Sequence, residues 1–332
     1  MDGNVERAYA ESVETLPRRI VNASLTVVLP LFALIGAGYA ARRTGVLDPH
    51  AASVLNAFVV WLALPALLFD ITARNRWSTL WQPGFIATFG AATALVFALV
   101  FVVRLRTGRH IADASVDAIA ASYSNTGYVG LPLCLLVFGQ GSQVEATIAT
   151  LIVVCALFSV AVVLIELGLR RSGGVDARGL LVALGRSLRN PLVLAPALGA
   201  ACSGAGLAMP ASVETFLKLI GPAATPCALV SLGLFLADRP KSRRSEGRAM
   251  LAISAIKLIA MPALTWLLAR AVFGLPEGAT RCAVLLAALP TGTGPFMLAE
   301  FYRREVGVTS AATLLTTLLS LLTLSALLIR MT

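Results

Sequence analysis

The chain is poor in charged residues, and in lysine above all. Only 13% of its 332 residues are charged and 58% are apolar, whereas soluble domains average roughly 25% charged residues. The three lysines are Lys218, Lys241 and Lys257, and there is no Gly-x-x-x-x-Gly-Lys-Ser/Thr motif, which excludes a P-loop site for ATP. This composition indicates a polytopic membrane protein.

Metal-binding and catalytic motifs are also missing. The five cysteines lie in apolar stretches without paired spacing, and neither His50 nor His110 has a His or Cys neighbour, so we predict no metal and no cofactor. His-Glu-x-x-His, Gly-x-Ser-x-Gly and paired aspartates within apolar segments are absent, which argues against an intramembrane enzyme. We therefore expect a protein that is not an enzyme.

Ten apolar windows have about the 20-residue length that a bilayer core requires. They cover residues 24–41, 53–71, 84–103, 114–138, 147–169, 190–206, 213–236, 249–273, 279–301 and 308–329. Asn190-Pro191 predicts a helix start in the sixth window, because Asn is a preferred N-cap and Pro a preferred first residue. The polar residues before the first window lack the apolar run of a cleavable signal peptide.

Basic residues are distributed unequally between the predicted loops. Seventeen of the 27 Lys and Arg residues follow the odd-numbered windows, eight lie on the other side, and Lys218 and Lys257 lie within windows. Short cytoplasmic loops hold the excess of positive charge, so we predict a cell (inner) membrane location with both termini on the outer side. The net charge of +10 then needs no nucleic-acid partner.

Two windows contain residues that disfavour a helix. In the fourth, Asn125 is followed by Gly127, Gly130 and Pro132, and the ninth contains Leu289-Pro290-Thr291-Gly292-Thr293-Gly294-Pro295. A Gly costs a helix interior roughly 1 kcal/mol and a Pro about 3. In hydrocarbon, freed backbone groups are tolerated only beside protein or a water-filled cavity. Each break is therefore a candidate binding site.

The two breaks occupy corresponding positions in two halves of the chain. Pro65 in the second window precedes Asn125 by 60 residues, and Pro226 in the seventh precedes Pro290 by 64. Five spans is an odd number, so the second half must insert upside down, as in inverted-repeat transporters. We predict an all-α membrane protein of ten transmembrane helices. Its parts are an outer polar tail (1–23), a first five-helix repeat (24–169), a short cytoplasmic linker (170–189) and a second five-helix repeat (190–332).

The breaks also suggest how an anion is bound. A helix N-terminus presents unpaired N–H groups and a partial charge near +0.5, and helices that restart after Gly127 and after Gly294 would bring two such ends together. The predicted substrate-binding residues are Asn125, Thr126, Gly127, Tyr128, Pro132, Lys257, Pro290, Thr291, Gly292, Thr293, Gly294 and Pro295, with Pro65, Gly130 and Pro226 as structural or gating residues. The alternative is a pair of kinks satisfied by neighbouring helices, without a ligand. Tyr123 and Phe296 either line the cavity or serve in packing.

The few charged residues inside the windows have two interpretations each. Lys257 lies eight residues inside the eighth window, where its ammonium group either counters a substrate carboxylate or snorkels to the cytoplasmic interface. Asp70, Glu166 and Glu300 are candidates for cation coupling, but each has an Arg four residues later, which is the spacing of surface ion pairs on a helix. Coupling to a proton or to sodium is left open.

Several of these segments carry a resemblance that covers nearly the whole membrane part. The matching residues are Gly38-Tyr39, Arg43 to Leu47, Asn56 to Phe69, Asn125-Thr126, Gly130 to Leu133, Lys257-Leu258, Pro262, Leu289-Pro290, Pro295-Phe296 and Ala299. On these residues the chain resembles the auxin efflux carrier family, which includes the plant PIN carriers and bacterial relatives assigned to malonate and similar organic acids. The combination of Asn-Thr-x-x-x-Gly-x-Pro with the match in the ninth window makes the resemblance fairly specific.

The resemblance implies a scaffold part and a transport part, with fourth and ninth helices that cross where their helicity is interrupted and an organic anion held beside the crossing. Two features depart from the family. Many bacterial relatives carry Asn where Gly294 stands here, and the linker from about residue 170 to 189 lacks the long cytoplasmic loop of the larger plant carriers.

We therefore expect a secondary transporter, an efflux carrier of a small organic anion that is auxin-like or a dicarboxylate such as malonate, working by alternating access around the helix crossing. The alternatives are a cation-coupled organic-acid symporter of the bile-acid-transporter-like type and an anion channel. The expected partners are the organic anion and the lipid bilayer. A homodimer formed through scaffold helices is a further expectation, although no residue spacing supports it.

Overall fold

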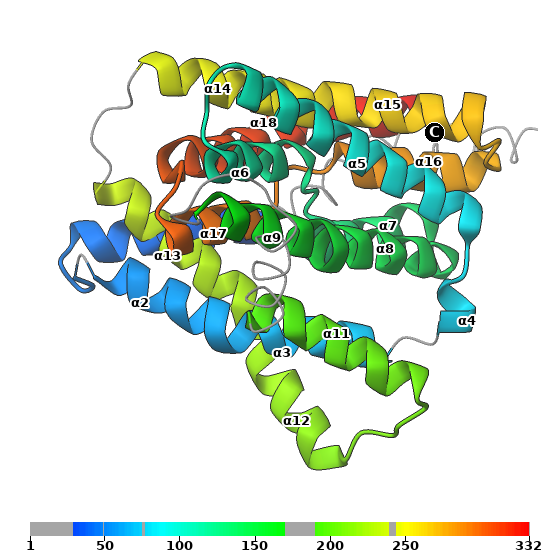
Figure 1. The fold of residues 1–332 in the computed structure, drawn as a ribbon, viewed down its shortest axis with the longest axis horizontal. Coiled ribbons are helices and arrows are strands. Elements are labelled where there is room, and N and C mark those ends of the chain that lie inside the picture. Colours follow the sequence, from blue (N-terminus) through cyan, green and yellow to red (C-terminus); the bar gives the residue numbers. More distant parts are fainter. Residues whose placement is uncertain (1–28, 49, 75–76, 170–189, 239–243, 332) are drawn as a thin grey trace, which may run out of the picture.

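The computed structural model describes residues 29–48, 50–74, 77–169, 190–238 and 244–331, and most of them are helical (Figure 1). The helices are residues 29–43, α2 (Ala51–Phe58), α3 (Leu64–Arg74), α4 (Trp77–Leu80), α5 (Pro83–Arg106), α6 (Ile111–Ser122), α7 (Leu131–Phe138), α8 (Gln143–Thr150), α9 (Phe158–Gly168), α11 (Pro191–Gly204), α12 (Ala211–Ile220), α13 (Ala224–Asp238), α14 (Arg244–Ala255), α15 (Met261–Leu267), α16 (Glu277–Ala288), α17 (Gly294–Tyr302) and α18 (Val306–Met331). Short π-helical turns are η1 (Val59–Ala63), η2 (Thr126–Gly130), η4 (Leu151–Leu157), η6 (Ile256–Ala260) and η7 (Leu268–Val272), and short 3-10 turns are η3 (Gln140–Ser142) and η5 (Gly221–Ala223). No strand is present in these described ranges.

Consecutive helices join into segments that are long and apolar enough to cross a membrane. Within the described residues there are six: Ala51–Arg74, Pro83–Arg106, Gln140–Gly168, Ala211–Asp238, Gly247–Val272 and Val306–Met331. Thr126–Phe138 and Pro191–Gly204 are shorter apolar helices. The chain is thus a multi-pass membrane protein. Over its described residues, each of the ten predicted windows coincides with helices, and the fourth and ninth are divided. The predicted tail (1–23) and linker (170–189) lie outside the described residues.

Local sequence signals explain where several helices begin or change pitch. Asn190 caps α11 as predicted, since its side-chain oxygen accepts a hydrogen bond of 3.0 Å from the Leu192 amide. Three prolines each follow a π-helical turn by two residues: Pro65 after η1, Pro132 after η2 and Pro262 after η6. The wide turn accommodates a ring that cannot donate and that would otherwise meet the carbonyl one turn earlier.

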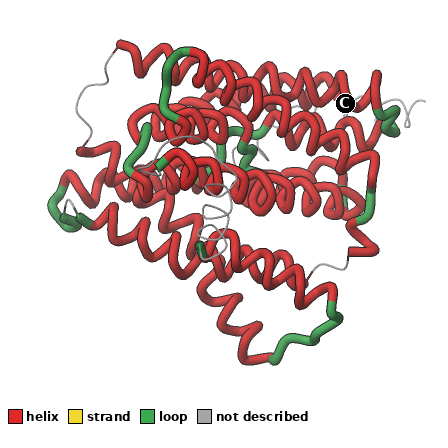
Figure 2. Tube along the Cα trace, in the orientation of Figure 1, coloured by secondary structure: helices red, strands yellow, loops and turns green. Residues whose placement is uncertain are grey.

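The helices pack into two groups. The first group, in the lower part of Figure 1, consists of residues 29–43, α2, α3, α11, α12 and α13; its closest pairs are α3 with α11 and α2 with α13. The second group consists of α5 to α9 and α14 to α18, in which α5 packs on α6, α6 on α9, α15 on α16 and α14 on α18. Figure 2 shows that loop segments lie inside this helical body as well as at its ends.

Glycines allow the closest helix approach in the first group. A Cβ atom added to Gly38 would lie 2.2 Å from the carbonyl oxygen of Val230, and one added to Gly233 would lie 2.0 Å from that of Ile35. Neither position can carry a side chain without moving a backbone. Close contact through small residues is the usual way for helices to associate in lipid, and here it joins residues 29–43 to α13.

Ion pairs link the α5–α6 connection to the turn between α17 and α18. Arg109 lies 3.1 Å from Glu305, and Arg304 lies 3.1 Å from Asp113. A further pair lies between α5 and α6, where Arg104 pairs with the fully buried Asp117.

The prediction of a surface pair is confirmed for Asp70, which pairs with Arg74. It is wrong for Glu300, because α17 ends at Tyr302 and Arg304 therefore leaves the helix face of Glu300 and pairs with Asp113. The carboxylate of Glu166 accepts a hydrogen bond of 2.8 Å from the Tyr302 hydroxyl; its predicted partner, Arg170, lies outside the described residues.

Candidate functional site

The two helix breaks meet through their main chains. Helix α6 ends at Ser122 and α16 at Ala288. A bridge joins Ser124 to Thr291, and beside it the Asn125 amide donates to the Pro290 carbonyl at 2.9 Å. The Gly292 amide donates to the carbonyl of Tyr123 at 3.1 Å. Each break thereby satisfies backbone groups that the other has freed, which is a requirement at membrane depth.

Side chains from neighbouring helices support the second break. The Thr291 hydroxyl donates to the Ala120 carbonyl at 2.9 Å, and the Thr291 amide donates to the hydroxyl of Thr316 at 3.1 Å. Lys257 is fully buried and its Nζ donates to the Ala287 carbonyl at 2.6 Å, so its ammonium group does not snorkel. A cation there complements the negative end of α16 and pairs one of its free carbonyls.

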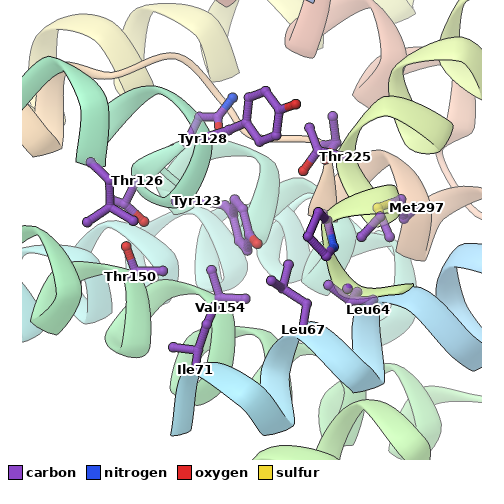
Figure 3. Close-up of a pocket in the computed structure, with 18 of the residues that line it drawn as sticks. Leu64, Leu67, Ile71, Tyr123, Thr126, Tyr128, Thr150, Val154, Thr225 and Met297 are labelled. Carbon is purple, nitrogen blue, oxygen red and sulfur yellow. The ribbon is translucent and has the colours of Figure 1, made fainter. Parts of the chain in front are cut away.

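A cavity of about 350 Å³ lies where the breaks face the first helix group. From the second group it is lined by Tyr123, Ser124, Asn125, Thr126, Gly127, Tyr128, Leu131, Thr150, Val154, Thr293, Gly294 and Met297, and from the first group by Leu64, Leu67, Ile71, Gly221, Pro222, Ala224 and Thr225. Figure 3 shows the two sets of side chains around the central ring of Tyr123. The cavity therefore lies at the boundary between the groups.

The polar atoms of the cavity are neutral. The Oγ1 atom of Thr126 is buried and has no hydrogen-bond partner among the described residues. Thr293 precedes α17 without capping it through its side chain. The hydroxyl of Thr150 already donates to the Ala146 carbonyl at 2.7 Å. None of the described lining residues carries a formal charge, so helix ends and neutral donors are what the cavity offers to an anion.

Two new helix starts border this cavity. The chain resumes its helical path at Thr126, two residues before the predicted restart at residue 128, and α17 begins at Gly294 itself. The first turn of a helix leaves N–H groups without intrahelical partners, and Thr126, Gly127 and Gly294 all line the cavity. Both positive helix ends thus border the same space.

Tyr123 decides which residues fit at the second break. A Cβ atom on Gly292 would lie 2.7 Å from Cε1 of the Tyr123 ring, and one on Gly294 would lie 2.8 Å from its Cζ. The ring packs edge-on against Phe158, with centroids 6.2 Å apart, so it cannot swing away without repacking. Glycine stands at position 294 because the tyrosine ring occupies the space of a side chain there.

The structure brings half of the predicted binding residues to the cavity. Asn125, Thr126, Gly127, Tyr128, Thr293 and Gly294 line it, and Pro132, Lys257, Pro290, Thr291, Gly292 and Pro295 do not. Lys257, Pro290, Thr291 and Gly292 instead make the contacts that hold the second break in place. Pro295 is buried in the first turn of α17, and Phe296 packs against Phe235 with centroids 5.8 Å apart.

The predicted structural residues lie next to the lining. Pro65 follows the lining residue Leu64, and Pro226 follows Thr225. A Cβ atom on Gly130 would lie 2.9 Å from side chains of Leu286 and Leu289, so this glycine lets η2 approach α16 and the second break.

Sequence reasoning missed the wall that the first helix group supplies. Leu64, Leu67 and Ile71 recur at helical spacing within an apolar segment, where nothing distinguishes them from lipid-facing residues. Thr225 and Thr150 had a weak signal, since each is polar within an apolar run and Thr225 adjoins Pro226. Tyr123 was noted only as a residue that either lines or packs, and it does both.

Comparison with known proteins gives the same class of protein. The family described as "Membrane transport protein" matches residues 23–328. A Rhizobium meliloti (strain 1021) protein named "Putative malonate transporter" is 34% identical over 306 residues, which are 91% of this chain and 94% of that protein. An "Uncharacterized transporter" of Methanothermobacter thermautotrophicus is 28% identical over 92% of this chain and 97% of its own length.

A plant relative matches a shorter region. The "Auxin efflux carrier component 3a" of Oryza sativa subsp. japonica is 32% identical over 152 residues, 44% of this chain and 24% of the plant protein. The matched family and these relatives are transporters, not enzymes.

Proposed function

The chain belongs to the auxin efflux carrier family of membrane transport proteins, and from this premise we propose that it is a secondary transporter that exports a small organic anion by alternating access. The observation that carries the proposal is the cavity of about 350 Å³ between the paired helix breaks and the first helix group. Sites for small molecules typically have volumes of roughly 300–1,000 Å³, so this cavity suits a small substrate.

We take a dicarboxylate of the size of malonate as the first substrate to test. The relative named for malonate is similar over nearly the whole of both chains, whereas the plant carrier matches less than half of this one. A dianion also uses both helix N-termini at once, one carboxylate at each. The Thr126 hydroxyl, which lacks a partner among the described residues, is free to bind the same ligand.

Movement of the second helix group against the first is the proposed transport step. The cavity lies between the groups, so a change in their relative tilt would open it to one side of the membrane and then to the other. We propose ten transmembrane helices in two inverted five-helix repeats, with both termini outside. This arrangement is supported by the breaks at corresponding positions of the two halves and by the unequal distribution of basic residues.

Counterflow in liposomes tests the proposal. The purified full chain is reconstituted, loaded with unlabelled malonate and given labelled malonate outside, alongside a panel of other labelled organic acids. A carrier accumulates label transiently, because each outward step returns the site for an inward one. An anion channel shows no such transient accumulation of label, and that result would overturn the proposal. Imposed proton and sodium gradients distinguish a symporter, whose uptake follows the gradient.

Asn125→Ala is the matched variant for this assay. Its side chain borders the cavity, and the main-chain bond of residue 125 to Pro290 does not depend on it. We expect folded protein with strongly reduced uptake. Normal uptake by this variant would remove the crossing from the mechanism.

A further inference from the structure

A second cavity, of about 790 Å³, lies between the segment from η6 to η7, the first turns of α16 and the C-terminal end of α18. It shares no residue with the cavity at the helix breaks. In Figure 1 the ends of α15 and α16 come together beside the C-terminus. The cavity has a charged end and an apolar wall, and each indicates one half of an amphipathic ligand.

Three arginines and one glutamate form the charged end. The Glu277 carboxylate lies 3.2 Å from Nη1 of Arg270 and 3.2 Å from Nε of Arg281, so one negative charge is shared by two positive ones. Arg330 makes no ion pair or hydrogen bond that the described residues show. Nη1 of Arg281 also donates to the Met331 carbonyl. These four lining residues therefore carry a net charge of +2.

The concentration of arginine at this end runs against the charge distribution of the chain. Only eight Lys and Arg residues lie on the sparsely charged side predicted from the sequence, and Arg270, Arg281 and Arg330 are three of them. The excess of Lys and Arg in cytoplasmic loops does not explain positive charge on the opposite side of the membrane. A local anion does give a reason.

The apolar wall continues from the charged end along the helices. It is formed by Leu258, Ile259, Pro262, Ala263, Trp266, Val284, Ala326 and Leu327. Ile259 is 66% exposed and Trp266 is 55% exposed, although both belong to a segment apolar enough to span a membrane. Tryptophan is typical of the level where lipid headgroups meet acyl chains, and the wall beside it then faces the hydrocarbon.

We propose that this cavity binds an anionic phospholipid, with its phosphate on Arg330 and Arg281 and one acyl chain along the wall from Trp266 to Ile259. Arginine pairs with phosphate through two parallel N–H donors, and basic pockets between membrane helices are suited to anionic headgroups. A small soluble anion would use the arginines and leave the wall unused. The lipid would be attached to the second helix group, which also carries both breaks.

The test uses the purified full chain in nanodiscs of phosphatidylcholine alone or mixed with phosphatidylglycerol. We expect phosphatidylglycerol to raise the unfolding temperature, and native mass spectrometry to detect retained phosphatidylglycerol. Arg330→Gln breaks no hydrogen bond or ion pair among the described residues, so it should unfold like the unaltered chain in phosphatidylcholine. Its binding of phosphatidylglycerol should be about tenfold weaker, the loss expected for one charged hydrogen-bond donor.

Two further variants separate the parts of the site. Ala263→Phe fills the exposed wall without changing charge and should also reduce lipid retention. Lys218→Gln removes a basic side chain that is 59% exposed and lies outside the cavity, and it should retain lipid normally.

Two results would overturn the proposal. One is equal lipid retention by the unaltered chain, Arg330→Gln and Ala263→Phe. The other is an equal rise in unfolding temperature with inorganic phosphate in phosphatidylcholine nanodiscs, because the site would then bind a free anion and not a lipid.

Discussion

Thr126 has a hydroxyl oxygen that is buried at the cavity and unpaired within the described part of the chain. Thr126→Val keeps the shape and removes the polar atom. If this hydroxyl binds substrate, its loss costs about 0.5–1.5 kcal/mol, so we expect KM for the transported acid to rise about 2- to 10-fold with little change in unfolding temperature. Labelled uptake over a range of concentrations measures the effect.

Thr265→Val is the matched control for that measurement. Thr265 is equally buried, bonds the Met261 carbonyl within its own helix and lies outside the cavity. Its variant should keep the original KM. An unchanged KM for Thr126→Val as well would remove this hydroxyl from substrate binding.

The ring of Tyr123 occupies the space that a side chain at position 294 would need. Gly294→Asn places a side chain against the tyrosine ring, where the added Cβ would lie 2.8 Å from Cζ, and overpacking of this kind costs about 1–3 kcal/mol. We expect a lower unfolding temperature and reduced uptake. Tyr123→Ala combined with Gly294→Asn should recover stability relative to Gly294→Asn alone, and absence of any recovery would contradict this steric competition.

At the scale of elements, the contact between α5 and α6 includes one internal ion pair. Asp117 is fully buried and its partner Arg104 is 19% exposed. Arg104→Gln leaves the carboxylate without its cation, and breaking a buried pair in this way costs about 3–5 kcal/mol. We expect a clearly lower unfolding temperature in detergent micelles. Arg106→Gln, at an exposed position of the same helix, should unfold like the unaltered chain, and similar values for both variants would disprove this role.

At the scale of the whole molecule, side-chain hydrogen bonds of the described residues join the two helix groups at Asn56, which donates to the Met297 carbonyl, and at Asn190. Nδ2 of Asn190, which caps α11, lies 3.2 Å from the hydroxyl of Tyr302 in α17. If transport needs movement between the groups, Asn190→Cys with Tyr302→Cys joined by a short bismaleimide should stop uptake. The measurement is uptake before and after cross-linking in a background free of the native cysteines.

A pair within one helix controls for the chemistry of cross-linking. Glu214→Cys with Lys218→Cys lies in α12, where the original side chains are 3.2 Å apart, and its cross-linking should leave uptake unchanged. Full uptake after complete joining of residues 190 and 302 would rule out this movement.

The orientation of the chain in the membrane is also a property of the whole molecule. Ser78 in α4 and Thr107 after α5 are both exposed, and Ser78 precedes the start of α5 whereas Thr107 follows its end. With both termini outside, Ser78→Cys should react with an impermeant thiol reagent added to intact cells, and Thr107→Cys should be protected until the cells are opened. The reverse pattern would invert the topology.

The second break was predictable because glycine and proline act locally, and the chain is non-helical from Leu289 to Thr293. The first break was predicted too far along the chain: it lies at residues 123–125, and Gly127, Gly130 and Pro132 belong to the helical turns η2 and α7 that follow it. Residues 125–132 and 289–295 read as helix-breaking without any knowledge of what surrounds them, and the Asn190 cap was predictable for the same reason. The role of Lys257 was not, because whether a lysine snorkels, meets a ligand or bonds a carbonyl depends on which chain segment lies beside it. Here that segment is the end of α16, which lies 30 residues away in the sequence.

By itself the sequence determined that this is a membrane protein, where its helices run and which two of them are interrupted, since hydropathy and helix breaking depend on nearby residues alone. Only the tertiary structure decided that the two interruptions hydrogen-bond to each other, that Tyr123 fills the space beside Gly294, and that Leu64, Leu67 and Thr225 complete the cavity. These contacts join segments far apart in the chain, and their geometry follows from how the two helix groups pack.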